Sequence, residues 1–160
     1  MALSIAYLAV IAALASAVIA LGTDFRRNVF TRTLPFLLLG MSGAAAVAAG
    51  GWALFDNLKL TQQLPLGLPW MHWHLRLDAL SAFFFAIVGL LLVAVSFYGP
   101  AYVREFESSK QPLPVLVLFT GLFAAGMLLV LLADDAFAFM VAWELMSVSS
   151  YFLVTYQHQN

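Results

Sequence analysis

The amino-acid sequence predicts an all-α fold, a polytopic bundle of about five membrane-spanning helices. Hydrophobic residues make up 64% of the 160 residues, charged residues only 9%, and the mean hydropathy is +0.97. Such a composition is typical of integral membrane proteins and not of soluble domains. Separate apolar runs of about 20 residues match the length that a helix needs to cross the hydrocarbon core. We therefore expect one integral membrane domain over residues 1–160, in the inner (cytoplasmic) membrane of the cell.

The apolar runs predict helices over residues 4–21, 34–55, 79–98, 113–133 and 136–156. The first run has no cation before it and is longer than the apolar region of a typical signal peptide, so we interpret it as a span. The second run carries small residues four apart, and so does the fourth, at Gly40, Ala44, Ala48, Gly121 and Ala125. Small residues at this spacing allow helix backbones to approach closely, which predicts packing surfaces.

The longest connection, residues 56–77, predicts a short strand near the membrane surface. It contains Pro65, Pro69, Trp70 and Trp73. Proline breaks helices and tryptophan suits the membrane interface. From Met71 to Leu77, apolar residues alternate with His72, His74 and Arg76, which is the period-two pattern of a strand. The two histidines would project on one side, but no third ligand is near, so we expect no metal site.

Acidic residues mark the ends of the later helices. Asp78 stands directly before the third run, where an aspartate is a natural N-cap. Asp134 and Asp135 form a short turn without cations between the fourth and fifth runs. The position of Asp78 predicts a structural role at a helix boundary.

Loop cations predict the orientation of the helices. The connections after the first and third helices hold five cations, and the other side holds two: Arg26, Arg27, Arg32, Arg104 and Lys110, against Lys59 and Arg76. Arginine and lysine near span ends are retained in the cytoplasm. We therefore expect the N-terminus outside, the acidic turn on the outer face and the fifth helix running inward.

Several functional classes are excluded by composition. The net charge of −1 gives no basic surface for nucleic acid. The absence of cysteine excludes disulfides, cysteine-ligated zinc and iron–sulfur clusters within this chain. No catalytic triad, phosphate loop or cofactor fingerprint is present in the sequence. We expect no self-contained active site and no cofactor in this chain, so any redox chemistry belongs to a partner.

Glu144 is the leading candidate for a functional residue. It lies about eight residues inside the fifth predicted helix, which is about 12 Å at 1.5 Å per residue and near the midplane of a core about 30 Å thick. An ionisable side chain at that depth costs about 2.5 to 3.5 kcal/mol on insertion scales. Removal from water favours the neutral acid, and an approaching cation or water favours release of the proton. The position predicts a residue that binds and releases protons.

Further polar residues share a helix face with Glu144. At 100° per residue, the face spans an arc of about 80° and includes Ser147, Tyr151, Thr155 and His158. Hydroxyl groups at such spacing can hold water or hydrogen-bond in turn, as a proton path requires. We call Glu144, Ser147, Tyr151 and Thr155 the polar stripe. A purely structural glutamate, hydrogen-bonded to a neighbouring helix, is the alternative, and no other acid or base lies within the predicted spans.

Two segments resemble a known family. Leu75–Glu107 (LRLDALSAFFFAIVGLLLVAVSFYGPAYVREFE) and Ala142–Val154 (AWELMSVSSYFLV) are similar to the antiporter-like membrane subunits of respiratory complex I, Mrp-type cation/proton antiporters and membrane-bound hydrogenases. Within that family the resemblance is to the hydrogenase-4 component B type, in which a WELMS-x-SSYFLV helix follows an LDALSAFF helix and a short acidic hairpin. It covers most of the chain from Leu75 onward, and the first two helices match only in pattern.

The resemblance implies a longer subunit of about fourteen helices with two inverted repeats, of which this chain is the N-terminal part. Glu144 matches the family's fifth-helix glutamate, which works with a lysine on the seventh helix to gate proton movement. The family's partner lysines and histidines lie in helices that this sequence does not contain.

Three functions follow as hypotheses. The first is a membrane subunit of a proton-translocating hydrogenase or NADH dehydrogenase-like complex, which couples electron transfer in peripheral partners to proton or cation translocation through Glu144. The second is an Mrp-type sodium/proton antiporter subunit. The third is a structural membrane anchor that holds a redox enzyme and transports nothing. In the first and third, the expected partners are other membrane and peripheral subunits of a redox complex, together with the lipid bilayer.

Overall fold

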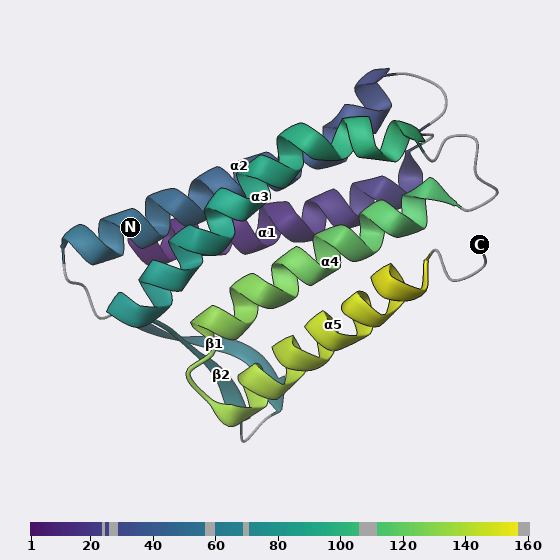
Figure 1. Ribbon diagram of the computed structural model, residues 1–160. Helices are drawn as coiled ribbons and strands as arrows, with labels where there is room; N and C mark the ends of the chain where they lie inside the picture. Colours follow the sequence, from purple (N-terminus) through teal and green to yellow (C-terminus); the bar gives the residue numbers. More distant parts are fainter. Residues whose placement is uncertain (24, 26–28, 57–59, 69–70, 106–111, 157–160) are drawn as a thin grey trace.

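Five long helices and one β-hairpin make up the computed structural model, which describes residues 1–23, 25, 29–56, 60–68, 71–105 and 112–156 (Figure 1). The elements are α1 (Ala2–Gly22), α2 (Val29–Phe55), β1 (Leu60–Leu68), β2 (Met71–Leu77), α3 (Ala79–Glu105), α4 (Leu113–Leu132) and α5 (Ala136–Thr155). All five helices are long and apolar enough to span a membrane. The prediction of an all-α polytopic bundle is confirmed, with a small hairpin added at one end.

Two predicted helix boundaries were wrong by several residues. The helix predicted over 34–55 begins at Val29, and the one predicted over 79–98 continues to Glu105. Each contains a proline, Pro35 in α2 and Pro100 in α3. Proline removes one backbone hydrogen bond, but neighbouring helices compensate for that loss in membrane proteins, so the helix continues through it. The other three predicted helices differ from the structure by one or two residues at an end.

α1 lies in the middle of the bundle. It packs against α2 on one side and α4 on the other, while α3 packs on α2 and α5 packs on α4. Figure 1 shows α5 at one edge, next to α4. The alanine-rich faces of α1 are fully buried, for example at Ala6, Ala9 and Ala13. This order places α3 and α5 at the two edges, where one flank of each is open.

Glycines bring α2 and α3 into direct backbone contact. A Cβ added to Gly43 would lie 2.6 Å from the Gly89 carbonyl oxygen, and one added to Gly89 would lie 2.7 Å from the Gly43 carbonyl oxygen. Gly50 meets the Ala82 carbonyl oxygen in the same way, at 2.5 Å. Small residues permit this close approach between membrane helices. We call these residues the glycine seam.

The predicted small-residue surface of α2 was partly wrong. Gly40 does approach α3, since an added Cβ would lie 2.6 Å from Ser96 Oγ, but Ala44 and Ala48 are exposed. α2 carries small residues on most of its faces, so spacing alone did not identify the packed one. The prediction for α4 is confirmed, because Gly121 lies against the Ala17 backbone of α1 and Ala125 is fully buried.

Two buried serines join α1 to α2 by hydrogen bonds to backbone carbonyls. Ser16 Oγ donates to the Pro35 carbonyl at 2.7 Å, and Ser42 Oγ donates to the Ala9 carbonyl at 2.6 Å. Both side chains are almost fully buried. Such interhelical bonds satisfy hydroxyls that would otherwise face hydrocarbon.

Replacement of Ser42 by alanine is therefore expected to weaken the α1–α2 contact. Interhelical hydrogen bonds in membrane proteins contribute about 0.6 kcal/mol on average and up to about 1.7 kcal/mol, and the short buried bond of Ser42 belongs in the upper part of that range. The free energy of unfolding in detergent micelles measures the loss. Ser4→Ala, at an exposed position on α1, is the matched control. Equal stability of the two variants would contradict the expectation.

The hairpin covers the end of the bundle where α1 begins. β1 pairs with β2 in antiparallel register from Leu60 opposite Leu77 to Leu68 opposite Met71, with an irregularity between Leu64 and Gly67. The predicted strand β2 is confirmed, whereas β1 was not predicted. Leu75 and Leu77 are buried and His72 and His74 are exposed, as the alternation indicated. The Tyr7 hydroxyl of α1 donates to Gln62 Oε1 at 3.2 Å and so ties the hairpin to the bundle.

Candidate functional site

α5, the helix that carries the polar stripe, is positioned by its first turn and by one packed face. Asp135 is its N-cap, and its carboxylate accepts a hydrogen bond from the Ala138 N–H at 2.8 Å. Ala138, Ala142 and Ser149 are buried against the bundle. On α4, Gly126 admits the backbone of Met146, to which an added Cβ would lie only 3.0 Å away. These contacts fix the rotation of α5 about its own axis.

That rotation turns Glu144 away from the bundle. At 100° per residue, Ala142 lies about 160° and Ser149 about 140° around the helix from Glu144. The Glu144 side chain is accordingly exposed on the surface of the described bundle. Met140 and Val148, on the same face, are 56% and 49% exposed. The Glu144 carboxyl group thus sits on an outward surface beside exposed apolar side chains, about 12 Å along the helix from its start.

The rest of the polar stripe lies on the same outward face. Ser147 and Tyr151 are exposed and Thr155 is half-buried. The Thr155 hydroxyl donates to the Tyr151 carbonyl at 2.8 Å, within its own helix. The fifth polar residue of that face, His158, lies outside the described residues. The structure therefore brings the stripe to one surface without linking its side chains directly.

Glu144 has no polar partner in the part of the chain that the structure describes: no hydrogen bond or ion pair joins its carboxyl group to another described side chain. The flank of the stripe is instead closed by an aromatic contact, because Phe152 stacks on Phe119 of α4 with ring centroids 4.4 Å apart. A polar partner for the Glu144 carboxyl group would therefore have to come from beyond the described residues.

A second polar cluster lies at the hairpin end of the molecule. The His74 N–H donates to Asp135 Oδ2 at 2.7 Å, and the Asp134 N–H donates to the His74 carbonyl at 2.9 Å. Arg76 Nε lies 3.0 Å from Asp134 Oδ1, and its Nη2 lies 3.6 Å from Asp78 Oδ2. We call these five residues the hairpin clamp. It joins β2 to the α4–α5 turn and to the start of α3.

The predicted N-cap role of Asp78 is confirmed. Asp78 Oδ1 accepts a hydrogen bond from the Ser81 N–H at 2.9 Å, as an N-cap does. This hydrogen bond, with the nearby Arg76, holds the pKa of Asp78 below its ordinary value. Sequence reasoning did not predict the contact between the α4–α5 turn and β2. The sequence did contain one signal for this contact, which was charge. The acidic α4–α5 turn and strand β2, which carries Arg76, were both expected on the outer side of the membrane.

Asp135 also has a lowered pKa. Partial burial raises the pKa of this carboxyl group, but the hydrogen bonds from the Ala138 and His74 N–H groups, with the nearby His74 ring, leave it below the ordinary value of 3.8. The ionised form is therefore the one that the clamp stabilises. His74 Nδ1 lies 3.7 Å from Asp135 Oδ2.

We expect the hairpin clamp to loosen in acid. A carboxyl group whose pKa is lower in the folded protein contributes stability that is fully present above its unfolded pKa and is lost as the pH falls through 3.8 towards the folded value. Hydrogen exchange at the His74 amide, corrected for the intrinsic rate, should therefore speed up below about pH 4. Asp135→Asn keeps a capping oxygen and should remove this acid-induced change. An acid response that persists in Asp135→Asn would assign it to other groups.

The described residues hold no group of three histidine, cysteine, aspartate or glutamate side chains that could bind a metal ion. His72 is exposed, and the His74 ring lies beside the Asp135 carboxylate within the hairpin clamp. A small polar hollow of about 140 Å³ lies beside them, lined by Thr61, Gln62, Gln63, His74, Leu75 and Asp134. Its one carboxylate is already paired with Arg76.

Comparison with known proteins supports the resemblance noted in the sequence. No family model matches the chain. It is 40% identical over 102 residues to a Staphylococcus aureus (strain MRSA252) protein named as antiporter subunit mnhA2, and 42% identical over 80 residues to hydrogenase-4 component B of Escherichia coli (strain K12). These matches cover 61% and 50% of this chain. An uncharacterized protein of Mycobacterium tuberculosis (strain ATCC 25618 / H37Rv), Rv0083, is 36% identical over 121 residues, or 76% of this chain.

The chain spans only 12% to 16% of the length of these relatives. The two named relatives are each, by name, one part of a larger assembly. Together with the five apolar helices, they identify the chain as a multi-pass membrane protein that resembles the complex I-like and Mrp antiporter membrane subunits. The predicted resemblance to this family is confirmed.

Proposed function

We propose that the protein is a proton-translocating membrane subunit of a redox-linked complex, in which Glu144 binds and releases the proton. The observation that carries the proposal is the place of Glu144: mid-depth on α5, turned outward, with no polar partner among the described residues. A charged carboxylate facing lipid at that depth is costly. The outward face of α5 is therefore completed by polar groups from elsewhere in the assembly.

In this proposal the polar stripe supplies the path to Glu144. Ser147 and Tyr151 lie on the same exposed face, so their hydroxyl groups can hydrogen-bond water beside the carboxyl group. A basic group brought to this face would favour the ionised carboxylate, and its withdrawal would favour the neutral acid. Alternation between these two states takes up one proton and releases it again, and the proton crosses the membrane when uptake and release face opposite sides. The family resemblance supplies the candidate for that group, a lysine of another helix.

The orientation and setting are part of the proposal. The loop cations support an N-terminus on the outer side of the cytoplasmic membrane. The hairpin clamp then faces outward, and the start of α4 faces the cytoplasm. Of the cations counted for this orientation, Arg26, Arg27, Lys59 and Lys110 lie outside the described residues. The partners in this setting are other membrane subunits and peripheral redox subunits.

A sodium/proton antiporter subunit is the second candidate, because a relative at 40% identity is named as an antiporter subunit. Membrane vesicles that hold the complete assembly distinguish the two. Acidification of the vesicle interior, followed with a pH-sensitive dye, should require a redox donor such as hydrogen or NADH under the first proposal. A pH change driven by a sodium gradient without any donor would select the antiporter. If vesicles that hold the intact complex show neither response, the result selects the non-transporting anchor.

A further inference from the structure

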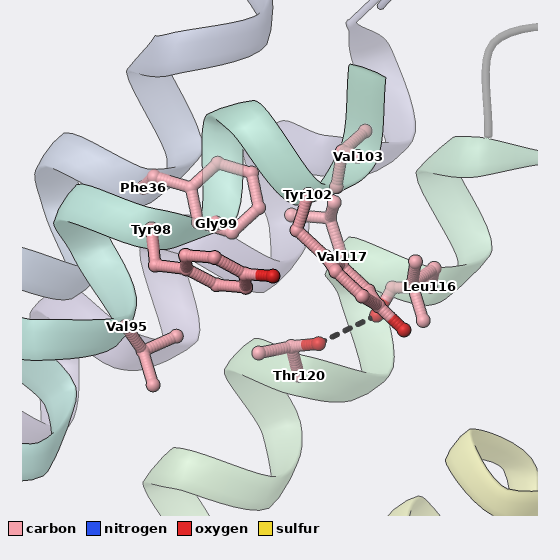
Figure 2. A pocket seen from close by; sticks show the side chains of 9 residues that line it. All are labelled: Phe36, Val95, Tyr98, Gly99, Tyr102, Val103, Leu116, Val117 and Thr120. Carbon is pink, nitrogen blue, oxygen red and sulfur yellow. Dashed lines mark hydrogen bonds between the residues drawn. The ribbon is translucent and has the colours of Figure 1, made fainter. Parts of the chain in front are cut away.

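A groove between α3 and α4 and the polar hollow beside the hairpin are lined by different kinds of side chain. The groove has a volume of about 230 Å³, and its lining includes Phe36, Tyr98 and Tyr102 (Figure 2). No described histidine or carboxylate lines it. The wall of the hollow contains His74 and Asp134. Histidine ordinarily changes its charge between about pH 5 and 8, so the hairpin end, and not the groove, holds a group suited to respond to pH.

The start of α5 depends on strand β2 for part of its anchoring. α5 packs on α4 alone among the helices that it contacts closely, and only three of its 20 residues are buried. β2 adds two contacts beside its first turn. The His74 N–H donates to the Asp135 carboxylate at 2.7 Å, and Leu75 forms an isolated antiparallel bridge with Ala133. The position of β2 therefore helps to fix where α5 begins.

The His74 ring lies beside the carboxylate that caps α5. Its Nδ1 atom is 3.7 Å from Asp135 Oδ2, and the His74 side chain is 50% exposed. The other oxygen of the same carboxylate, Oδ1, accepts the N-cap hydrogen bond from the Ala138 N–H. Because the ring is open to water, it can take up a proton without any opening of the clamp. A charge on the ring would then act directly on the N-cap of α5.

The charged groups around the ring are mainly acidic. The hairpin clamp holds three carboxylates and one guanidinium besides the ring, so negative charge is in excess when the ring is neutral. The groups that face the ring are Asp134 and Asp135 from the α4–α5 turn, Asp78 from the start of α3, Arg76 and the exposed His72 from β2, and the uncharged Thr61, Gln62 and Gln63 from β1. A cationic ring is therefore electrostatically favoured in the closed clamp.

We propose that His74 is a pH-sensitive anchor for α5. As the pH at the hairpin end falls from about 8 to about 6, the ring takes up a proton from water, pairs with Asp135 and holds the start of α5 more firmly to β2. The pair is lost as the pH rises and the ring releases that proton. Below about pH 4 the carboxylate itself is protonated, so the clamp is tightest between about pH 4 and 6. The inference holds whether or not Glu144 carries protons.

Hydrogen exchange between pH 6 and 8 tests the proposal on the complete protein in detergent micelles, with each rate corrected for its intrinsic pH dependence. The Asp134 and Ala138 amides donate to the His74 carbonyl and to the Asp135 carboxylate. An exposed ion pair shifts an equilibrium by about 1.5- to 5-fold. Both amides should accordingly exchange about threefold more slowly at pH 6 than at pH 8.

Matched variants assign the response to the ring. His74→Gln keeps the main-chain bonds of the clamp but removes the titrating group, and it should abolish the difference between pH 6 and pH 8. Asp135→Asn removes the negative charge that the ring pairs with and should abolish it too. His72→Gln removes an exposed histidine of the same strand that is outside the clamp, and the response should stay as in the wild type.

The proposal is overturned if the wild type exchanges equally at both pH values or faster at pH 6. It is also overturned if the response persists in His74→Gln or disappears in His72→Gln. Unchanged protection of the buried α1–α2 contact around Ser42 shows that each variant is folded. Vesicles that fail to translocate protons would contradict the function proposed for Glu144 and would leave the exchange result to decide the role of His74.

Discussion

Replacement of Glu144 by glutamine is expected to abolish proton translocation while the five-helix bundle stays intact. Glutamine keeps the size and hydrogen-bonding capacity of the side chain but cannot exchange a proton at neutral pH. Glu144 is exposed and has no described polar partner, so the stability of the bundle should change by less than about 0.5 kcal/mol. The initial rate of donor-driven acidification in vesicles measures the loss. Glu144→Asp, which keeps a titratable group, should retain part of the rate.

The control for this experiment lies on the same helix face. Met140→Leu changes an exposed apolar side chain one turn before Glu144 and should leave the rate unchanged. The amount of assembled complex in the membrane is measured alongside. A Glu144→Gln complex that assembles normally and still translocates protons at the full rate would falsify the proposed role. Loss of assembly in that variant alone would instead support the structural anchor.

The second large effect is expected in the glycine seam. Gly50→Ala should destabilise the α2–α3 pair by about 1 to 3 kcal/mol, the usual cost of forcing an added group into a packed interface. The added methyl group would meet the Ala82 carbonyl oxygen at 2.5 Å and the Ala86 backbone nitrogen at 3.0 Å. Backbone atoms cannot move aside as a flexible side chain can, so the two helices must separate.

The adjacent glycine supplies the comparison. An added Cβ at Gly51 would have no atom within 4 Å. Gly51→Ala should therefore be neutral or stabilise the helix by up to about 1 kcal/mol, since alanine loses less backbone entropy than glycine. Unfolding of both variants in the same detergent measures the difference. Similar stabilities for the two would show that the seam is less tightly packed than its geometry indicates.

The spans could be predicted from the sequence because membrane-spanning length and apolarity are local properties. Strand β2 could be predicted for the same reason, from the alternation between Met71 and Leu77. Strand β1 could not, since LTQQLPLGL lacks a clear alternation and gains its pairing from β2. The continuation of α3 past Pro100 also depends on neighbours, because tertiary contacts decide whether a membrane helix tolerates a proline.

The candidate site was predictable in part. Helical periodicity places Glu144, Ser147 and Tyr151 on one face from the sequence alone. Which way that face turns depends on α4, where Gly126 accepts the backbone of Met146. The hairpin clamp and the groove beside Tyr98 join segments far apart in the chain, so no local pattern reveals either of them.

The central position of α1 has a consequence for how the protein is made. The chain enters the membrane N-terminus first, so α1 arrives before both of its neighbours. α2 follows soon and covers one face through the Ser42 bond. The other face, which includes Ala17, gains its contact only when Gly121 of α4 is inserted. At about 5 to 20 residues per second, ribosomes need about 5 to 20 seconds to synthesise the intervening segment. Until α4 is inserted, this face of α1 lacks its α4 partner, and insertion of α4 is the step that closes the core.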